Sequence, residues 1–233
     1  MKENKDKRKI GLGIILRVPL FVVLQIIILF GAAGRIDIPR AWIYFVIVFV
    51  YYSIGLVIMY KFNPELLYRR SRGIGKGTKS WDKILMPVIV ILTYIQLAVI
   101  GFDLGRFQWY YLGINFAILG LIMYIFLAFL GTWITITNPF FEPTVRIQKE
   151  REHKVITTGP YRIVRHPMYF GFILFIVFYC LALGSLFSLI PSALGVVGIV
   201  IRTILEDRML HKELEGYTEY AQKTKKKLIP LIW

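Results

Sequence analysis

GPYRIVRHPMYFGFILFIVFYCLALGSL, residues 159–186, contains the two features that decide the fold: a ring-bearing, cationic cluster and an apolar run that follows it at once. The run 167–184 is close to the roughly 20 residues that an α-helix needs to cross a bilayer. Five further apolar runs occupy about 11–33, 41–60, 84–103, 109–136 and 187–205. Because backbone polar groups in lipid must pair within their own segment, such runs fold as helices. The sequence therefore predicts an all-α, polytopic integral membrane bundle of five to six transmembrane segments with a short cytoplasmic C-terminal cap.

The overall composition agrees with this class and excludes others. Hydrophobic residues make up 57% of the chain, and the mean hydropathy is +0.61, above that of ordinary soluble domains. Cys180 is the single cysteine, which excludes an internal disulfide framework and a cysteine-rich zinc site. The three histidines (His153, His166 and His211) lack the spacing of metal ligands on one helix face, so we expect no metal.

The net charge of +15 is distributed unevenly between the two sides of the expected bundle. Of 29 Lys and Arg residues, 24 fall in the N-terminal tail, the 61–83 and 137–166 connections and the tail after 205. The alternate connections hold only Arg35, Arg40 and Arg106. This positive-inside pattern predicts that both termini are cytoplasmic, in a cell membrane if the host is prokaryotic or the endoplasmic reticulum if it is eukaryotic. The basic excess thus indicates topology and contact with membrane lipids, not nucleic-acid binding.

The chain is expected to divide into two parts. Residues 1–136 form a transmembrane scaffold of about four helices, and residues 137–233 form the catalytic region with its cytoplasmic loop, helical hairpin and cap. The 61–83 connection is expected to be a mobile basic loop at the lipid headgroups. Uncharged polar residues within the scaffold segments are expected to form interhelical hydrogen bonds. They are Gln25, Ser53, Thr93, Gln96 and Asn115.

The candidate site lies where two parts of the catalytic region meet. Arg202 and Glu206 are four residues apart and share one face of the last apolar helix. The hairpin turn at 183–186 brings them to the same side of the membrane as Arg165 and His166. Pro167 fits the first turn of a helix, whose free N–H groups favour an anion such as a carboxylate. An Arg and a Glu at a membrane edge can also be purely structural, stabilising the helix end.

Aromatic rings accompany these charges. Tyr161, Tyr169, Tyr217 and Tyr220 could cover an adenine ring or a sulfonium cation, since aromatic faces attract cations. Neither the 137–166 connection nor the 206–233 tail is long enough for a Rossmann domain. A nucleotide-derived cofactor would therefore bind between helix ends and these short segments.

Taken together, the motifs GPYxxVRHPxYxG, RxxxE(E/D)xxL, GYxxY and a terminal IP resemble the isoprenylcysteine carboxyl methyltransferase family, whose wider relatives include the membrane phospholipid N-methyltransferases. The specific resemblance covers residues 137–233. The front half of the chain resembles the family only in general character, through two short stretches, Asn63-Pro64-Glu65-Leu66-Leu67 and Lys79-Ser80-Trp81-Asp82.

The resemblance implies an S-adenosyl-L-methionine cofactor at the cytoplasmic end of the last helices, under the C-terminal cap. Arg202 and Glu206 match the catalytic positions of the family, and Asp207 stands where the family usually has a second Glu. The positions expected to contact the cofactor are Tyr161, Arg165, His166, Pro167, Tyr169, Gly171, Asp207, Tyr217 and Tyr220.

The motifs leave the methyl acceptor open. A carboxylate of an isoprenylcysteine or similar lipophilic acid needs no base but does need a cation such as Arg202 to orient it. An amine, as in phospholipid N-methylation, needs a base, for which Glu206 or His166 is available. Either acceptor has an apolar tail and is expected to enter from the bilayer between helices. An NADPH-dependent membrane reductase and a non-enzymatic transporter are further alternatives, while the oligomeric state is unknown.

Overall fold

The computed structural model describes residues 2–71, 75–108 and 112–233, with the backbone alone for residues 2–15 and 71. Within these ranges the chain is helical, without a β-strand, as predicted. The helices are α1 (Lys2–Ala33), α2 (Pro39–Phe62), α3 (Pro64–Ser71), α4 (Asp82–Gly101), the π-helical η1 (Phe102–Phe107), α5 (Ile114–Thr137), the 3-10 turns η2 (Lys149–Arg151) and η3 (Gly159–Arg162), α6 (Pro167–Leu183), α7 (Leu189–Glu213) and α8 (Tyr217–Lys223).

Five helical stretches in the described chain are long and apolar enough to cross a membrane. They are Leu16–Ala33, Pro39–Phe62, Asp82–Phe107, Ile114–Thr137 and Leu189–Glu213. The sixth predicted segment is α6, whose 17 residues extend about 25 Å along the helix axis, slightly less than the hydrocarbon core. The protein is therefore a multi-pass membrane protein.

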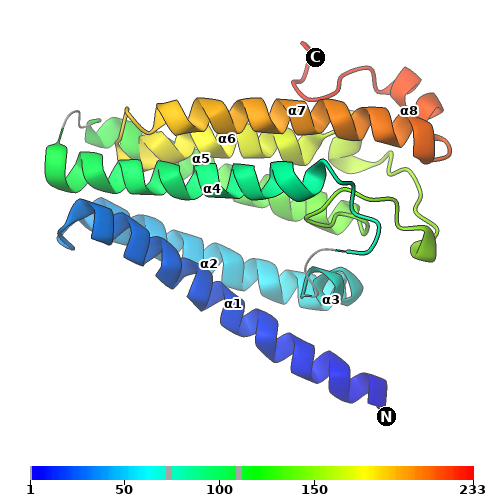
Figure 1. The fold of residues 1–233 in the computed structure, drawn as a ribbon, viewed down its shortest axis with the longest axis horizontal. Helices are drawn as coiled ribbons and strands as arrows, with labels where there is room; N and C mark the ends of the chain where they lie inside the picture. Colours follow the sequence, from blue (N-terminus) through cyan, green and yellow to red (C-terminus); the bar gives the residue numbers. More distant parts are fainter. Residues whose placement is uncertain (1, 72–74, 109–111) are drawn as a thin grey trace.

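The basic connections gather at one end of the bundle. Figure 1 shows α3, the segment between α5 and α6, and α8 together at this end, which we call the loop end. The α6–α7 turn and the α4–α5 connection lie at the opposite end of the bundle (Figure 1). The arrangement thus groups the segments that carry most of the Lys and Arg residues.

Small residues allow the helices to approach closely. A Cβ built on Gly120 of α5 would lie 2.3 Å from the backbone N of Ala182 in α6, and one on Gly101 would lie 2.3 Å from the carbonyl of Leu29 in α1. Such contacts are typical of membrane helices, which pack by van der Waals contact rather than by expelling water. They fix α1 against α4 and α5 against α6.

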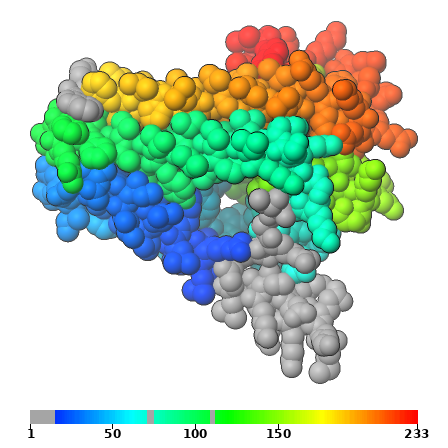
Figure 2. Space-filling model, viewed as in Figure 1, coloured from blue at the N-terminus to red at the C-terminus, as the bar shows by residue number. Residues whose placement is uncertain are grey.

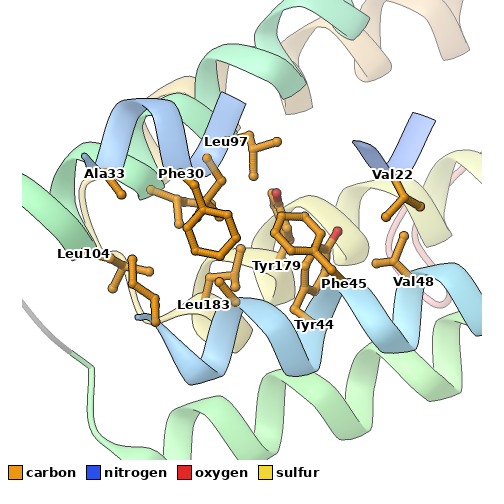
Figure 3. Close-up of a cluster of buried hydrophobic side chains, with 14 of the residues drawn as sticks. Val22, Phe30, Ala33, Tyr44, Phe45, Val48, Leu97, Leu104, Tyr179 and Leu183 are labelled. Atoms are coloured by element: carbon orange, nitrogen blue, oxygen red, sulfur yellow. The ribbon is translucent and has the colours of Figure 1, made fainter. Parts of the chain in front are cut away.

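A buried cluster fills the bundle where α1, α2, α4 and α6 meet. Figure 3 shows Tyr44 and Tyr179 beside Val22, Leu97 and other apolar side chains of this cluster. The two tyrosine rings lie 5.0 Å apart between centroids. Many large apolar side chains elsewhere are exposed, among them Phe129 and Ile122, as expected for a surface that faces lipid.

The last apolar run, 187–205, lies mostly within α7, which continues as one helix to Glu213 because beyond the bilayer a helix needs no apolar residues on every face. One expectation about a connection was wrong. The 61–83 connection was expected to be a mobile loop, but its first part folds as α3, where Glu65 and Arg69 pair one turn apart. Residues 72–74 of that connection lie outside the described residues.

The hairpin and the cap form as the sequence predicts. Pro167 is the first residue of α6, and Gly184 ends this helix with φ +85°, a left-handed conformation that suits glycine. Gly216, with φ +78°, separates α7 from α8. The tail then returns to the motif: the backbone N–H groups of Arg165 and His166 donate to the carbonyls of Lys226 and Lys227. The C-terminal cap is thereby tied to the N-terminus of α6.

Candidate active site

A cavity of about 100 Å³ opens at the loop end, between the 138–156 segment and the helices α6, α7 and α8. Most of the predicted cofactor residues line it. They are Tyr161, Arg165, His166, Pro167, Tyr169, Tyr217 and Tyr220, and Glu206 joins them from α7. The structure thus brings together, around one space, residues that the sequence spreads over sixty positions.

Asp207 lies behind this cavity and organises its wall. Its buried carboxylate accepts hydrogen bonds from Arg165 at 2.8 and 3.1 Å and from the Tyr217 hydroxyl at 2.9 Å. His166 Nε2 lies 3.3 Å away from it, and the Lys227 ammonium is also 3.3 Å away. Burial, followed by the charge of Asp207, raises the pKa of Tyr217, so the hydroxyl keeps its proton. Asp207 therefore joins the N-terminus of α6 to the C-terminal cap through Arg165, Tyr217 and Lys227.

Arg165 lines the cavity, but its guanidinium has protein partners. Besides Asp207, Nη1 donates to the carbonyls of Thr224 at 2.9 Å and Lys225 at 3.0 Å. The side chain is 5% exposed. Its visible role is to hold the tail against α6.

Tyr169 connects Glu206 to Arg202. Its hydroxyl donates a hydrogen bond to the Glu206 carboxylate, and the Arg202 guanidinium carbon lies 5.2 Å from its ring centroid. The four-residue spacing permits an ion pair between Arg202 and Glu206, but the ion-pair partner of Arg202 among the described residues is Asp82. Arg202 and Glu206 therefore do not stabilise the helix end by pairing with each other. Arg202 pairs with Asp82, and Glu206 accepts a hydrogen bond from Tyr169.

Asp82, at the start of α4, is a site residue that the sequence analysis missed. It is completely buried and accepts from Arg202 Nε at 2.8 Å and Nη2 at 3.3 Å. Its second oxygen also accepts the backbone N–H of Val145 at 2.7 Å, while Arg202 Nη2 donates to the Pro143 carbonyl at 2.7 Å. The only sequence signal was the likeness around Lys79–Asp82. The predicted scaffold therefore contributes directly to the site.

A second cavity, of about 220 Å³, lies in the membrane part of the bundle and is called here the membrane cavity. Arg202 and Ile199 line it from α7, and Gln25 lines it from α1. Its aromatic lining consists of Phe21, Tyr44, Tyr52, Tyr94, Tyr124, Tyr169, Phe172, Phe175 and Tyr179. Tyr169 lines both cavities, so one side chain separates the two spaces.

The segment 138–156 covers the loop-end cavity with a charged network that sequence reasoning did not identify. Arg146 Nε donates to Glu142 at 2.7 Å, and Arg146 Nη2 lies 2.8 Å from Glu150. Burial, followed by the neighbouring arginines, lowers the pKa of His153 to about 4, which keeps its ring neutral near pH 7. The His153 ring lies 4.5 Å from that of Phe140. These residues carry no recognisable motif, and only the folded segment reveals their position.

Gly171 differs from the other predicted cofactor positions. It lies outside the loop-end cavity, one turn further along α6, beside a smaller cavity lined by Tyr51 and Leu130. A Cβ added to Gly171 would meet Leu130 at 3.8 Å, an ordinary van der Waals distance.

Comparison of the sequence with known proteins identifies the family of this chain. A sequence profile described as the isoprenylcysteine carboxyl methyltransferase (ICMT) family matches residues 118–212. The chain is 31% identical over 142 residues to protein-S-isoprenylcysteine O-methyltransferase B of Arabidopsis thaliana, covering 60% of this chain and 69% of the relative. It is 34% identical over 85 residues to a probable protein-S-isoprenylcysteine O-methyltransferase of Oryza sativa subsp. indica, covering 36% of this chain and 44% of that relative. The chain belongs to the isoprenylcysteine carboxyl methyltransferase family of membrane methyltransferases.

Proposed function

We propose that the protein transfers a methyl group from S-adenosyl-L-methionine to the carboxylate of a lipophilic acid, such as an isoprenylcysteine, held in the membrane cavity. The observation that carries this proposal is the contact of two unlike cavities at Tyr169. One has a mixed lining of charged, polar and apolar side chains and lies at the loop end, and the other is largely apolar and aromatic and lies among the membrane helices. A soluble cofactor and a lipid-like acceptor need two such spaces with a common boundary.

The residues of the loop-end cavity suit the cofactor. When bound, S-adenosyl-L-methionine supplies an electrophilic methyl group on a cationic sulfonium. Tyr169, Tyr161 and Tyr217 offer aromatic faces, which attract cations. Glu206 contributes a negative charge, while Arg146 and Lys154 contribute positive charges for the carboxylate of the cofactor.

Arg202 is placed to orient the acceptor. Asp82 and the Pro143 carbonyl occupy Nε and Nη2, and Nη1 has no hydrogen-bond partner among the described residues. Since Arg202 also lines the membrane cavity, Nη1 is available to a substrate carboxylate. An ionised carboxylate attacks through its own oxygen, so no proton has to move.

An amine acceptor would require proton removal, for which Glu206, in the wall of the loop-end cavity, is a candidate base. Its carboxylate already accepts a hydrogen bond from the Tyr169 hydroxyl and does not line the membrane cavity, whereas Arg202 does. The geometry therefore favours the acid.

The acceptor reaches its cavity from the bilayer in this proposal. Helix α1 diverges from α4 toward the loop end (Figure 1), and the molecule is hollowed beside this divergence in Figure 2. Phe21 and Gln25 of α1 line the membrane cavity together with Met86 and Thr93 of α4. The loop end and both termini face the cytoplasm, in keeping with the charge distribution.

The test is binding and turnover by the purified full-length protein. Calorimetry should show binding of S-adenosyl-L-methionine and S-adenosylhomocysteine but not NADPH. Labelled methyl transfer to N-acetyl-S-farnesylcysteine should give a base-labile ester. Arg202→Ala should abolish ester formation, whereas Arg208→Ala, at an exposed position on the same helix, should preserve it. A base-stable N-methyl product, or NADPH binding alone, would reject the proposal.

A further inference from the structure

The carboxamide of Gln25 is unusual within this structure. Gln25 is 6% exposed, and its Nε2 is the one fully buried side-chain nitrogen or oxygen that lacks a hydrogen-bond partner among the described side chains. Leaving a buried donor unpaired costs about 1–3 kcal/mol, and lipid offers no water to replace the partner. The prediction of an interhelical hydrogen bond at Gln25 is therefore wrong, and the amide needs another explanation.

Gln96 shows what a structural glutamine looks like in the same bundle. Its Nε2 donates to the Ile176 carbonyl at 3.1 Å and lies 3.2 Å from the Cys180 sulfur, so it joins α4 to α6 as expected for an interhelical bond. Gln96 does not line the membrane cavity, whereas Gln25 does. Both glutamines are buried, but the Gln25 side chain lines a cavity, whereas the Gln96 side chain bonds to a neighbouring helix.

Gln25 lies at the end of the membrane cavity remote from Arg202. Val22 and Leu29, on the same face of α1, belong to the buried cluster of Figure 3. Leu29 meets Gly101, one turn beyond Leu97 on α4, while Arg202 meets Asp82 at the start of α4. Fifteen residues of helix separate Asp82 from Leu97, which corresponds to roughly 20 Å along the axis.

The remote end of the cavity has further polar groups. Tyr44 and Tyr179 are each 2% exposed, line the cavity and belong to the same cluster as Leu97. Their phenol rings and the Gln25 amide create a polar end wall within an otherwise apolar space. A plain hydrocarbon tail would leave Nε2 of Gln25 without a partner.

We propose that the membrane cavity prefers acceptor acids that carry a hydrogen-bond-accepting oxygen, such as a hydroxyl or carbonyl, at the end of the apolar chain remote from the carboxylate. Arg202 binds the carboxylate, and Gln25 Nε2 donates to the remote oxygen. Among lipophilic acids, the site thus favours a long-chain acid oxygenated at both ends over one with a plain hydrocarbon tail, such as an isoprenylcysteine. This inference rests on the proposed function, because it takes the membrane cavity as the acceptor site.

The test compares two acids of equal chain length, hexadecanoic acid and ω-hydroxyhexadecanoic acid, on the full-length protein in lipid nanodiscs with S-adenosylhomocysteine present. Calorimetry should give an affinity for the hydroxy acid roughly five- to tenfold higher than for the plain acid, the value of one hydrogen bond. Gln25→Leu should make the two affinities equal. Gln96→Leu, the matched control, should keep the preference while lowering thermal stability.

Equal affinities in the wild-type protein, as expected if a water molecule satisfies Gln25, would overturn the inference. Binding of neither acid, or a preference that survives Gln25→Leu, would also overturn it. Methyl-ester formation, measured in parallel with S-adenosyl-L-methionine, separates this result from the proposed function. A preference without ester formation from any acid would refute the proposed function, whereas ester formation with equal affinities would refute the inference alone.

Discussion

Asp82 and Arg202, 120 residues apart in the chain, form a two-point ion pair with N···O distances of 2.8 and 3.3 Å. The pair joins the start of α4 to the middle of α7. Because Asp82 also accepts the Val145 N–H, it connects the cover of the loop-end cavity to the arginine of the membrane cavity. One carboxylate thus sets the relative position of the two spaces.

Replacing Asp82 with Asn should impair catalysis more than cofactor binding. The neutral side chain leaves the Arg202 charge uncompensated and free to turn from the acceptor, and breaking a buried pair typically costs about 3–5 kcal/mol. We expect kcat to fall at least tenfold, in line with the loss of about 1.4 kcal/mol of transition-state stabilisation, with affinity for S-adenosylhomocysteine within about twofold. Asp82→Glu, which keeps the charge, should restore part of kcat. Unchanged kcat in soluble, folded Asp82→Asn would contradict the positioning role.

Removing the Tyr169 hydroxyl tests the boundary between the cavities. Tyr169→Phe keeps the ring beside Arg202 but deletes the donor to Glu206. A hydrogen bond to a charged group contributes about 1.5–3 kcal/mol, so kcat/KM should fall roughly tenfold to a hundredfold. Steady-state kinetics with Tyr94→Phe, a tyrosine elsewhere in the membrane cavity, supplies the control. Equal losses in both variants would mean that the Glu206 contact has no particular role.

Acidification should destabilise the cover of the loop-end cavity through His153. Burial lowers the pKa of His153 to about 4 from its usual 6.5, so between these values the unfolded chain binds a proton that the folded protein excludes. The stability contributed by this exclusion is fully present above pH 6.5 and is lost as the pH falls toward 4. Melting temperatures measured from pH 7 to pH 4 should therefore fall more steeply for the wild-type protein than for His153→Asn. Parallel curves would show that His153 is not the responsible group.

Gly171 offers a direct check on a residue assigned by family resemblance. Because it lies outside the loop-end cavity and a Cβ meets only Leu130 at 3.8 Å, Gly171→Ala should bind S-adenosylhomocysteine as the wild-type protein does. Alanine also favours the helix by up to about 1 kcal/mol relative to glycine, so the melting temperature should not fall. Calorimetry beside Tyr161→Ala, which removes a cavity wall, provides the comparison. A large loss of affinity in Gly171→Ala would place that position in the cofactor site after all.

The class of fold follows from the sequence because its causes are local. Apolar runs of bilayer length must be helical, and the lysines and arginines of the intervening connections are countable without knowing any contact. Pro167, Gly184 and Gly216 similarly mark element ends through their own backbone preferences. The grouping of Tyr161, His166, Tyr169 and Glu206 around one cavity also agrees with the motif spacing.

Tertiary structure decided the partners of the buried polar groups. Spacing along α7 places Arg202 near Glu206, but only the packing of α4 against α7 supplies Asp82, and only the fold of 138–156 supplies Pro143 and Val145. Nothing in the local sequence separates Gln25 from Gln96, yet one faces a cavity and the other a carbonyl of a neighbouring helix. Helix formation depends on residues a few positions apart, whereas a binding site depends on which faces of distant helices meet. The sequence by itself therefore determined the helices and their order across the membrane, while helix packing decided where charge, amide and cavity coincide.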